Sequence, residues 1–216
     1  VKDFAPIAEI ATSPNVITVQ PDLGVKTLKE FVALARKTPE KFNVTTPPIG
    51  TTPNLAAEVL KSREGLAKMA TVVHTGGGQA LQALLAGSVQ LSIGALAPAH
   101  ALIQSGKLVA LAVTGESRWH DLKDVPTMAE AGYRDFVLET YLGFLAPIKT
   151  SREIVALLEK ETLAILRNPA MRERLTKSGF TVQAKDGKGH MDRIRREMPM
   201  FKKIVADAGI KLPAKK

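Results

Sequence analysis

The chain has 216 residues, of which 45% are hydrophobic and 24% charged, a composition typical of a globular protein. It contains no cysteine, which excludes a disulfide framework and thiol chemistry. The formal net charge of +9 favours an anionic ligand, but only 5% of the residues are aromatic and these are not interleaved with the basic ones, so nucleic acid is not an expected partner. No apolar run approaches the roughly 20 residues that span a bilayer.

The first 46 residues predict two strands, a helix and a third strand. Residues 6–11 and 16–19 are apolar and β-branched, and the tripeptide SPN at 13–15 predicts a turn between them. Thr27 is a typical N-cap for the amphipathic helix that follows it. The third strand is expected at 42–46.

The next stretch, NVTTPPIGTTPNLAAE, predicts a strand, a tight turn and the start of a helix. Pro53 suits the first helical position and Thr52 the N-cap, so free backbone N–H groups are expected here, as in many anion sites. The hydroxyl groups of Thr51 and Thr52 can add donors to a carboxylate. The alternative is an ordinary β–α connection with a well-capped helix. The candidate binding residues are Gly50, Thr51, Thr52 and Asn54.

A run of glycines follows the strand predicted at 69–73 and opens another helix. This is the position of phosphate-binding loops, but the run is neither a dinucleotide fingerprint nor a Walker loop. One interpretation is a tight turn, and the other is a second set of exposed N–H groups facing the same cleft. The candidate residues are His74, Thr75, Gly76 and Gly77.

The alternation of strands and helices continues to residue 114 and predicts an α/β layer with a parallel sheet. The apolar run 108–114 is typical of a buried parallel strand. A polar connector at 116–126 precedes the last part of the chain. The elements expected there are strands at 137–141, 143–146 and 181–184, a helix over 152–168 capped by Thr150 with Glu153, a helix starting at Asn168-Pro169, and a helix from Met191 with a kink or break at Pro199.

Known enzyme and metal motifs are absent from the sequence. The four histidines are scattered, and His74, beside the glycines, is the one we place near a cleft. A structural role for His74 is the more common alternative to a chemical one. We therefore expect no catalytic residue, metal or cofactor.

The order of these motifs resembles that of the solute receptors of tripartite tricarboxylate transporters, the Bug-type periplasmic receptors. The resemblance runs through almost the whole chain, and its most specific part is DVPTMAEAG with LAP downstream. The stretches that carry it are VKDFAPIAEI, NVTTPPIGTTPNLAAE, VVHTGGGQALQALLAGSVQLSIG, GKLVALAVTGESRWHDLKDVPTMAEAGY, YLGFLAPIKTSREIVALLEKE, NPAMRERLTKSGF and VADAGIKLP.

The resemblance implies an α/β, type II periplasmic-binding-protein-like fold with two lobes and a small carboxylic acid in the cleft between them. Residues 11–114 would form the complete second lobe, and residues 1–10 and 115–216 the hinge and the C-terminal part of the first lobe. The turn from Gly50 to Asn54 would be one pincer of the site. His74–Gly78 would face it from the same lobe, with Tyr141 and Gly143 in the wall of the other.

Some positions depart from the family pattern. Asn54 stands where members often carry histidine, and Gln90 and Gly94 stand in a strand where they often carry acidic residues. The loss of an acid favours plain carboxylates over amino acids as ligands. The family's leading strand and glycine-rich loop are expected upstream of VKDF, so the first lobe is expected to be incomplete. Apolar stripes on the last helices would then face water, and a dimer or an exchange between chains would cover them.

The sequence therefore predicts a periplasmic receptor that binds a di- or tricarboxylate, or a related organic acid, and delivers it to a membrane permease. No signal-peptide pattern is visible at VKDFAPIAEI. Two alternatives remain open at this point. One is an enzyme with an α/β cleft, and the other is a truncated fragment that acts through protein–protein interaction.

Overall fold

The computed structural model describes residues 2–207, 209 and 210. The sequence also predicts that Ala208-Gly209 closes the helix from Met191, and Ala208 lies outside the described residues. The described residues form two compact units: unit 1 comprises those of 1–13 and 141–203, and unit 2 those of 14–140 and 204–216. The lobe boundary predicted at 11–114 stays a prediction, and unit 2 extends beyond that range by including the connector up to residue 140.

Unit 2 is built on a mixed sheet with the strand order β3-β2-β4-β1-β5. Strand β2 pairs in parallel with β3 and β4, whereas β1 pairs antiparallel with β4 and β5. The prediction of a parallel strand at 108–114 was therefore wrong, because the neighbour of this strand is β1. The strands are β1 (Phe4–Val19), β2 (Asn43–Thr46), β3 (Ala70–Val73), β4 (Leu91–Ala95) and β5 (Val109–Val113).

Strand β1 is a single element of 16 residues, and the turn predicted at Ser13-Pro14-Asn15 is absent from it. The strand pairs with one set of partners up to Thr12 and with another from Asn15 onward. Pro14 lies between the stretch that pairs with β7 and the stretch that pairs with β4 and β5. Pro14, which predicted a turn, thus lies inside strand β1.

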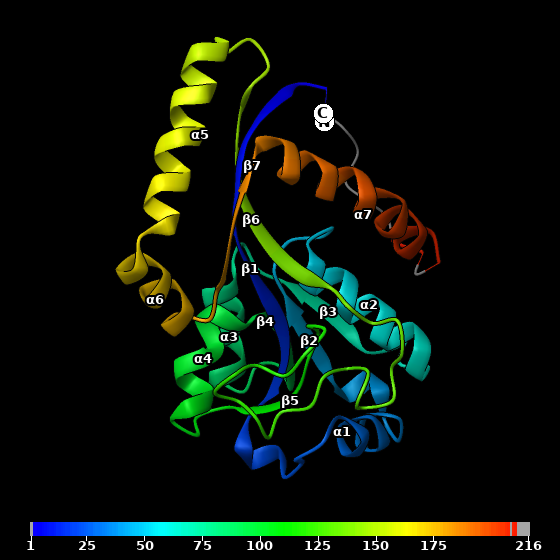
Figure 1. The fold of residues 1–216 in the computed structure, drawn as a ribbon. Helices are drawn as coiled ribbons and strands as arrows, with labels where there is room; N and C mark the ends of the chain where they lie inside the picture. Colours follow the sequence, from blue (N-terminus) through cyan, green and yellow to red (C-terminus); the bar gives the residue numbers. More distant parts are fainter. Residues whose placement is uncertain (1, 208, 211–216) are drawn as a thin grey trace. The chain divides into compact units, whose positions relative to one another are not determined.

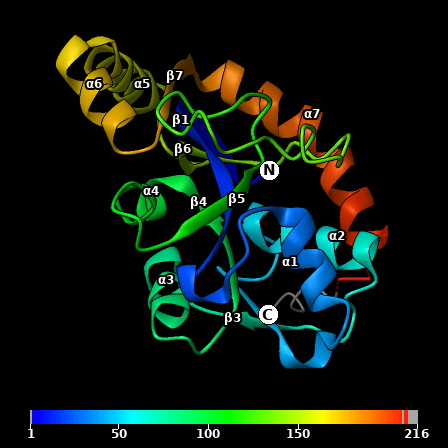
Figure 2. The same ribbon diagram turned by 90° about the horizontal axis from the view of Figure 1, so that it is seen from below.

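Helices cover both faces of the unit 2 sheet: α3 and α4 lie on one face, and α1 and α2 on the other (Figures 1 and 2). The apolar faces of α3 and α4 pack on β1 and β5, and Trp119 and Leu122 of the connector close this core. The bounds are α1 (Leu28–Ala35), α2 (Thr52–Glu64), α3 (Gly77–Leu85) and α4 (Leu96–Gln104), with 3₁₀ turns η1 (Pro21–Leu23) and η2 (Pro39–Lys41).

The helix starts largely follow their local signals. Thr27 caps α1 as predicted, and the structure adds a complete capping box with Glu30. Helix α2 begins one residue earlier than predicted: Thr51 is the N-cap and Thr52 the first helical residue. Gly65 ends α2 in the left-handed conformation, with φ of 68°.

In unit 1 the first part of β1 pairs with β6 (Glu139–Pro147) and β7 (Thr181–Asp186). The helices are α5 (Arg152–Arg167), α6 (Pro169–Lys177) and α7 (Gly187–Asp207), which ends beyond unit 1. Ser151, not Thr150, caps α5, because its hydroxyl accepts from the Ile154 amide. Asn168 caps α6 as predicted. The sequence predicts a kink or a break at Pro199, and helix α7 continues through this residue without a break.

Helix α5 is apolar on two faces. Val155 and Leu163 pack on the small core formed by Ile7, Ala8 and Ala146. The stripe predicted to face water does so, because its side chains are between 43% and 57% exposed: Ile154, Leu157, Leu158 and Ile165. The same expectation was wrong for the start of the α7 stripe, where Met191 is buried. None of the helices formed by the described residues is long and apolar enough to cross a membrane.

Candidate functional site

The predicted binding residues of unit 2 gather at one edge of its sheet. Strands β2 and β3 end side by side at Thr46 and Val73, and the His74 amide donates to the Thr46 carbonyl just beyond that edge. Helices α2 and α3 begin within a few residues of these strand ends. Open α/β sheets bind their ligands outside the carboxyl ends of parallel strands, which is where these residues lie.

The turn before α2 has a defined backbone geometry. The Thr51 amide donates to the Pro48 carbonyl over 3.1 Å, which closes a four-residue turn. Its third residue, Gly50, has φ of 87°, as a type II turn requires. Glycine is needed at this position because other residues are strained at such an angle.

Asn54 holds this turn in shape from inside. Its side-chain oxygen accepts from the Gly50 amide and its Nδ2 donates to the Thr46 hydroxyl. The residue is only 2% exposed, so its side chain serves the turn and does not reach solvent.

The two threonine hydroxyls of the turn donate within the protein. Thr51 Oγ1 donates to the Pro48 carbonyl over 2.7 Å. Thr140 donates its one hydroxyl proton to Asn15 Oδ1, so in the 3.0 Å contact between Thr52 and Thr140 the donor is Thr52. Asn15 Nδ2 lies 3.4 Å from Thr52 Oγ1, which completes a ring of three side chains. The donors left for a ligand at this turn are therefore backbone N–H groups.

The N-termini of α2 and α3 carry free donors and no compensating acid. Neither helix has a side-chain cap or an acidic residue in its first turn. No described residue accepts from the amides of Thr52 and Asn54 in α2, or of Gly77 and Gly78 in α3. The positive end of each helix dipole thus adds to these donors in favouring an anion.

The glycines of the second loop are not explained by backbone strain. Gly76, the N-cap of α3, is extended, and neither Gly77 nor Gly78 has a positive φ. A Cβ at Gly76 or Gly78 would meet no described atom within 4 Å, and one at Gly77 would make an ordinary contact with Pro98. The tight turn weighed as an alternative is therefore not what these glycines provide, and the space at the Cβ positions of Gly76 and Gly78 is open.

His74 lies between the turn and the glycines and is half-buried. Its Nδ1 is 2.8 Å from the hydroxyl of Thr45, on the neighbouring strand β2. Thr75 Oγ1 donates to Oε1 of Gln79 in α3 over 2.6 Å, so the Thr75 hydroxyl proton is not free for a ligand.

Gln90 is not near this site. Its side chain accepts from the Asn43 amide at the start of β2, the end of the strand opposite to Thr46. Gln90 therefore contributes no group to this edge, whereas Gly94 lies toward the carboxyl end of β4.

A cavity of about 260 Å³ adjoins the turn from the α2–β3 side. Glu58 contributes a carboxylate to it, held by Lys61 and Thr71. That negative charge disfavours a carboxylate ligand in this cavity. The anion site is therefore the exposed N–H edge and not the cavity. The cavity is lined by Ile49, Asn54, Glu58, Thr71, Val73, Gly209 and Ile210.

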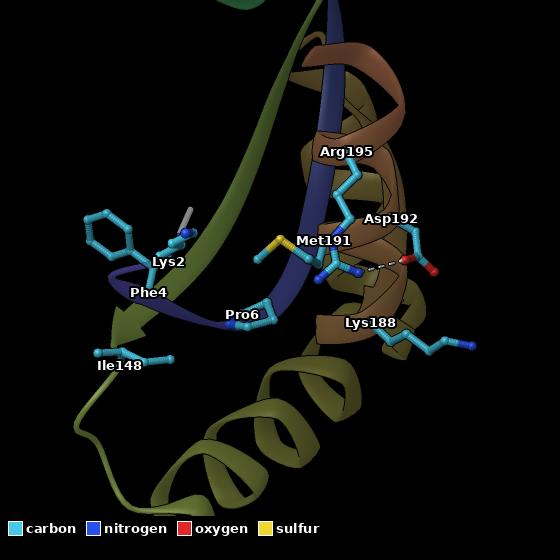
Figure 3. Close-up of a pocket in the computed structure, with 8 residues that line it drawn as sticks. All are labelled: Lys2, Phe4, Pro6, Ile148, Lys188, Met191, Asp192 and Arg195. Atoms are coloured by element: carbon cyan, nitrogen blue, oxygen red, sulfur yellow. Dashed lines mark ion pairs between the residues drawn. The ribbon is translucent and has the colours of Figure 1, made fainter. Parts of the chain in front are cut away.

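Unit 1 has a cavity of its own, of about 420 Å³ (Figure 3). Its lining residues are Lys2, Phe4, Pro6, Ile148, Lys188, Met191, Asp192 and Arg195. The nearby start of α7 offers few free donors, because the Gly187 and Gly189 amides already donate to the carboxylates of Glu159 and Asp186. This contrast favours the α2–α3 edge of unit 2 as the candidate anion site.

Tyr141 and Gly143, predicted as wall residues, belong to unit 1. Arg193 lies over the Tyr141 ring at 4.7 Å, and burial raises the pKa of Tyr141. Gly143 leaves room for His190, whose ring would lie 2.4 Å from a Cβ at that position. A ligand contact by Tyr141 stays a prediction.

Sequence reasoning missed three residues of the unit 2 edge. Asn15 and Thr140 fix Thr52, and Thr45 contacts His74. Asn15 was assigned to a turn, and Thr45 and Thr140 lie in strands where a single threonine carries no signal. The parallel register of β2 and β3 is the information that would have paired Thr45 with His74.

Comparison with known proteins identifies relatives over nearly the whole chain. The family model described as tripartite tricarboxylate transporter family receptor matches residues 1–210. A UPF0065 protein of Bordetella pertussis is 30% identical over 203 residues, which cover 92% of this chain and 62% of that protein. The protein BugT of the same organism is 28% identical over 98% of this chain and 64% of its own length.

Solved structures agree with this relationship. A structure named as R. palustris Rpa4515 with adipate has a TM-score of 0.90 at 28% identity, over 96% of this chain and 69% of that one. The periplasmic binding protein BugD has a TM-score of 0.92 at 27% identity, over 96% of this chain and 70% of its own. The chain spans between 61% and 64% of the length of three curated relatives.

Proposed function

We propose, from the premise that this chain belongs to the tripartite tricarboxylate transporter receptor family, that it binds a small organic carboxylate for transport. The observation that carries the proposal is the pair of uncapped helix N-termini at one sheet edge. Their free amides and dipoles favour an anion without needing a cationic side chain. The relative solved with adipate supports a dicarboxylate as ligand class.

The role of a receptor implies one further partner and a location. The ligand would be handed to a membrane permease, and the site of action would be the periplasm, as the description of the relative BugD indicates for that protein. The family description, which names a transporter, supports the first statement. Binding without chemical change is what this role requires, in contrast to an enzyme with an α/β cleft.

Native mass spectrometry of the purified chain tests the proposal. We expect a co-purified organic acid, or saturable binding of added adipate, with the acid recovered unchanged after long incubation. Conversion of the acid into another compound would favour the enzyme alternative instead. A chain that binds neither a co-purified acid nor any member of a panel of di- and tricarboxylates would refute the proposed function.

A second role, association with other polypeptide, is favoured by one observation in unit 1. Strand β6 pairs only with β1 among the described strands, and its side chains Leu142, Phe144 and Leu145 are exposed. Together with the outer stripe of α5, this surface would be covered in a dimer or by exchange between chains.

A further inference from the structure

His74 and Thr45 form a defined pair at the candidate site. Thr45 lies on β2, and His74 directly follows β3, the parallel neighbour of β2. The backbone hydrogen bond from the His74 amide to the Thr46 carbonyl fixes the position of His74 along β2. Thr45 Oγ1 lies 2.8 Å from Nδ1 of His74. The distance is that of a good hydrogen bond, but either atom can be the donor.

The surroundings of Thr45 decide the direction of that bond. Thr45 is 0% exposed, and no other described residue accepts a hydrogen bond from its hydroxyl. If Nδ1 carried the proton, the Thr45 O–H group would be buried without an acceptor, which native proteins avoid. If Thr45 donates to Nδ1, both groups are satisfied and the ring proton stands on Nε2.

We infer that Thr45 holds His74 in the tautomer with its proton on Nε2, and that this N–H group is a ligand donor that selects for a carboxylate. The inference rests on the proposed function, because it assigns a role at the same site. His74 is half-buried, and no described residue bonds to its Nε2. Thr45 is thus a positioning residue, and His74 the residue that touches the ligand.

The consequence concerns which ligands fit. A fixed Nε2–H group can only donate, and the free amides of Gly77 and Gly78, at the start of the helix that follows His74, can only donate as well. A ligand atom placed there must be an acceptor, so an ammonium group is rejected and a carboxylate oxygen is preferred. The pair therefore narrows the proposed ligand class. The ligand must present a carboxylate group to this edge, and an amino acid could not bind here through its ammonium group.

The tautomer is measured directly by long-range ¹H–¹⁵N correlation spectra of the imidazole at pH 8, where an ordinary histidine is neutral. We expect His74 to show a protonated Nε2 and an unprotonated Nδ1. T45S, which keeps the hydroxyl, should preserve this pattern, whereas T45V should give a mixture of tautomers. A protonated Nδ1 in the unmodified chain would overturn the inference without any ligand being present.

The role toward the ligand is tested by titration with adipate. H74Q, whose side-chain amide offers an N–H donor at a similar reach, should bind within about threefold of the unmodified chain, and H74F should bind at least about tenfold more weakly. Equal binding by H74F would refute the inference and leave the proposed function intact. Failure of the unmodified chain to bind any carboxylate would refute the proposed function and the ligand role together.

Discussion

Gly50 is the residue on which the shape of the α2 turn depends most directly. Its φ of 87° lies in the region where a side chain costs about 1–2 kcal/mol. We predict that G50A lowers the free energy of unfolding by about that amount, measured by urea denaturation. G78A is the matched control, because Gly78 lies in α3 without a positive φ and with open space around its Cβ position. G78A should be neutral or stabilising by about 0.5–1 kcal/mol, and an equal loss in both variants would contradict the assignment.

His190 makes the stability of unit 1 dependent on pH. It is 2% exposed, its Nδ1 has no partner among the described residues, and its surroundings include Tyr141, Glu9 and Arg193. Burial lowers the pKa of His190 from its ordinary value of 6.5, against the opposing effect of the Glu9 carboxylate. Below pH 6.5 the unfolded chain takes up a proton that the folded chain resists, so stability is lost as pH falls.

The expected result is a urea midpoint that decreases from pH 7.5 to pH 5.5, with a smaller decrease in H190Q. The comparison isolates His190 because the other titrating groups are common to both proteins. Parallel pH profiles for the two proteins would show that His190 titrates alike in the folded and unfolded chains.

At the scale of elements, the ring of Asn15, Thr52 and Thr140 joins β1, α2 and β6. Asn15 is fully buried, and its side chain also donates to the Leu138 carbonyl over 2.6 Å. Removing it leaves buried polar groups without partners, at a cost of about 1–3 kcal/mol. We predict that N15A lowers the free energy of unfolding by about 2 kcal/mol.

The control for N15A is T140S, which keeps the hydroxyl that donates to Asn15 Oδ1. It should lose less than about 1 kcal/mol, the typical effect of one buried methyl group. If N15A were as stable as T140S, the ring would contribute little to holding α2 in place.

Elements with strong local signals were predictable from the sequence, and those decided by distant contacts were not. The capping box at Thr27, the Asn168 cap and the strand–turn–helix order around Gly50 follow from neighbouring residues, and the structure has all three. The direction of β5 depends on its neighbour β1, which local sequence does not encode. Helix α5 has two apolar faces, so the sequence alone could not show which of them packs on the core.

The candidate site divides in the same way. The turn and the glycine loop were found because glycine, proline and threonine carry local signals at helix starts. The partners that orient them, Asn15 and Thr45, come from strands far away in the sequence. Their roles exist only once the strand register brings them together, so they could not be derived from the sequence alone.

For the whole molecule, the exposed apolar surface of unit 1 predicts association. The outer stripe of α5 includes Leu157, which is 57% exposed. We expect light scattering after size exclusion to show a species larger than the 23.2 kDa monomer, with the monomer fraction increasing in L157K. E161K, at an exposed position of the same helix, is the control and should not change the mass. A clean monomer at all concentrations would contradict this prediction.

The central claim is that backbone amides at the starts of α2 and α3 bind a carboxylate. Titration of the ¹⁵N-labelled chain with adipate, followed by ¹H–¹⁵N correlation spectra, observes these amides individually. Two variants of Thr52 separate its backbone from its side chain: T52A removes the side-chain hydroxyl and methyl groups and keeps the N–H group, whereas T52P removes the N–H group as well, at a helical position where proline is tolerated. A charge-assisted hydrogen bond contributes about 1.5–3 kcal/mol, so T52P should bind at least about tenfold more weakly than T52A.

In the unmodified chain the amides of Asn54, Gly77 and Gly78 should show the largest shifts, saturating with a common dissociation constant. Adipamide, which lacks the charge, should leave them unchanged at matched ionic strength. The account predicts saturable shifts at these amides and a dissociation constant at least about tenfold larger in T52P than in T52A. Shifts confined to other parts of the chain, or equal binding by T52P and T52A, would contradict it.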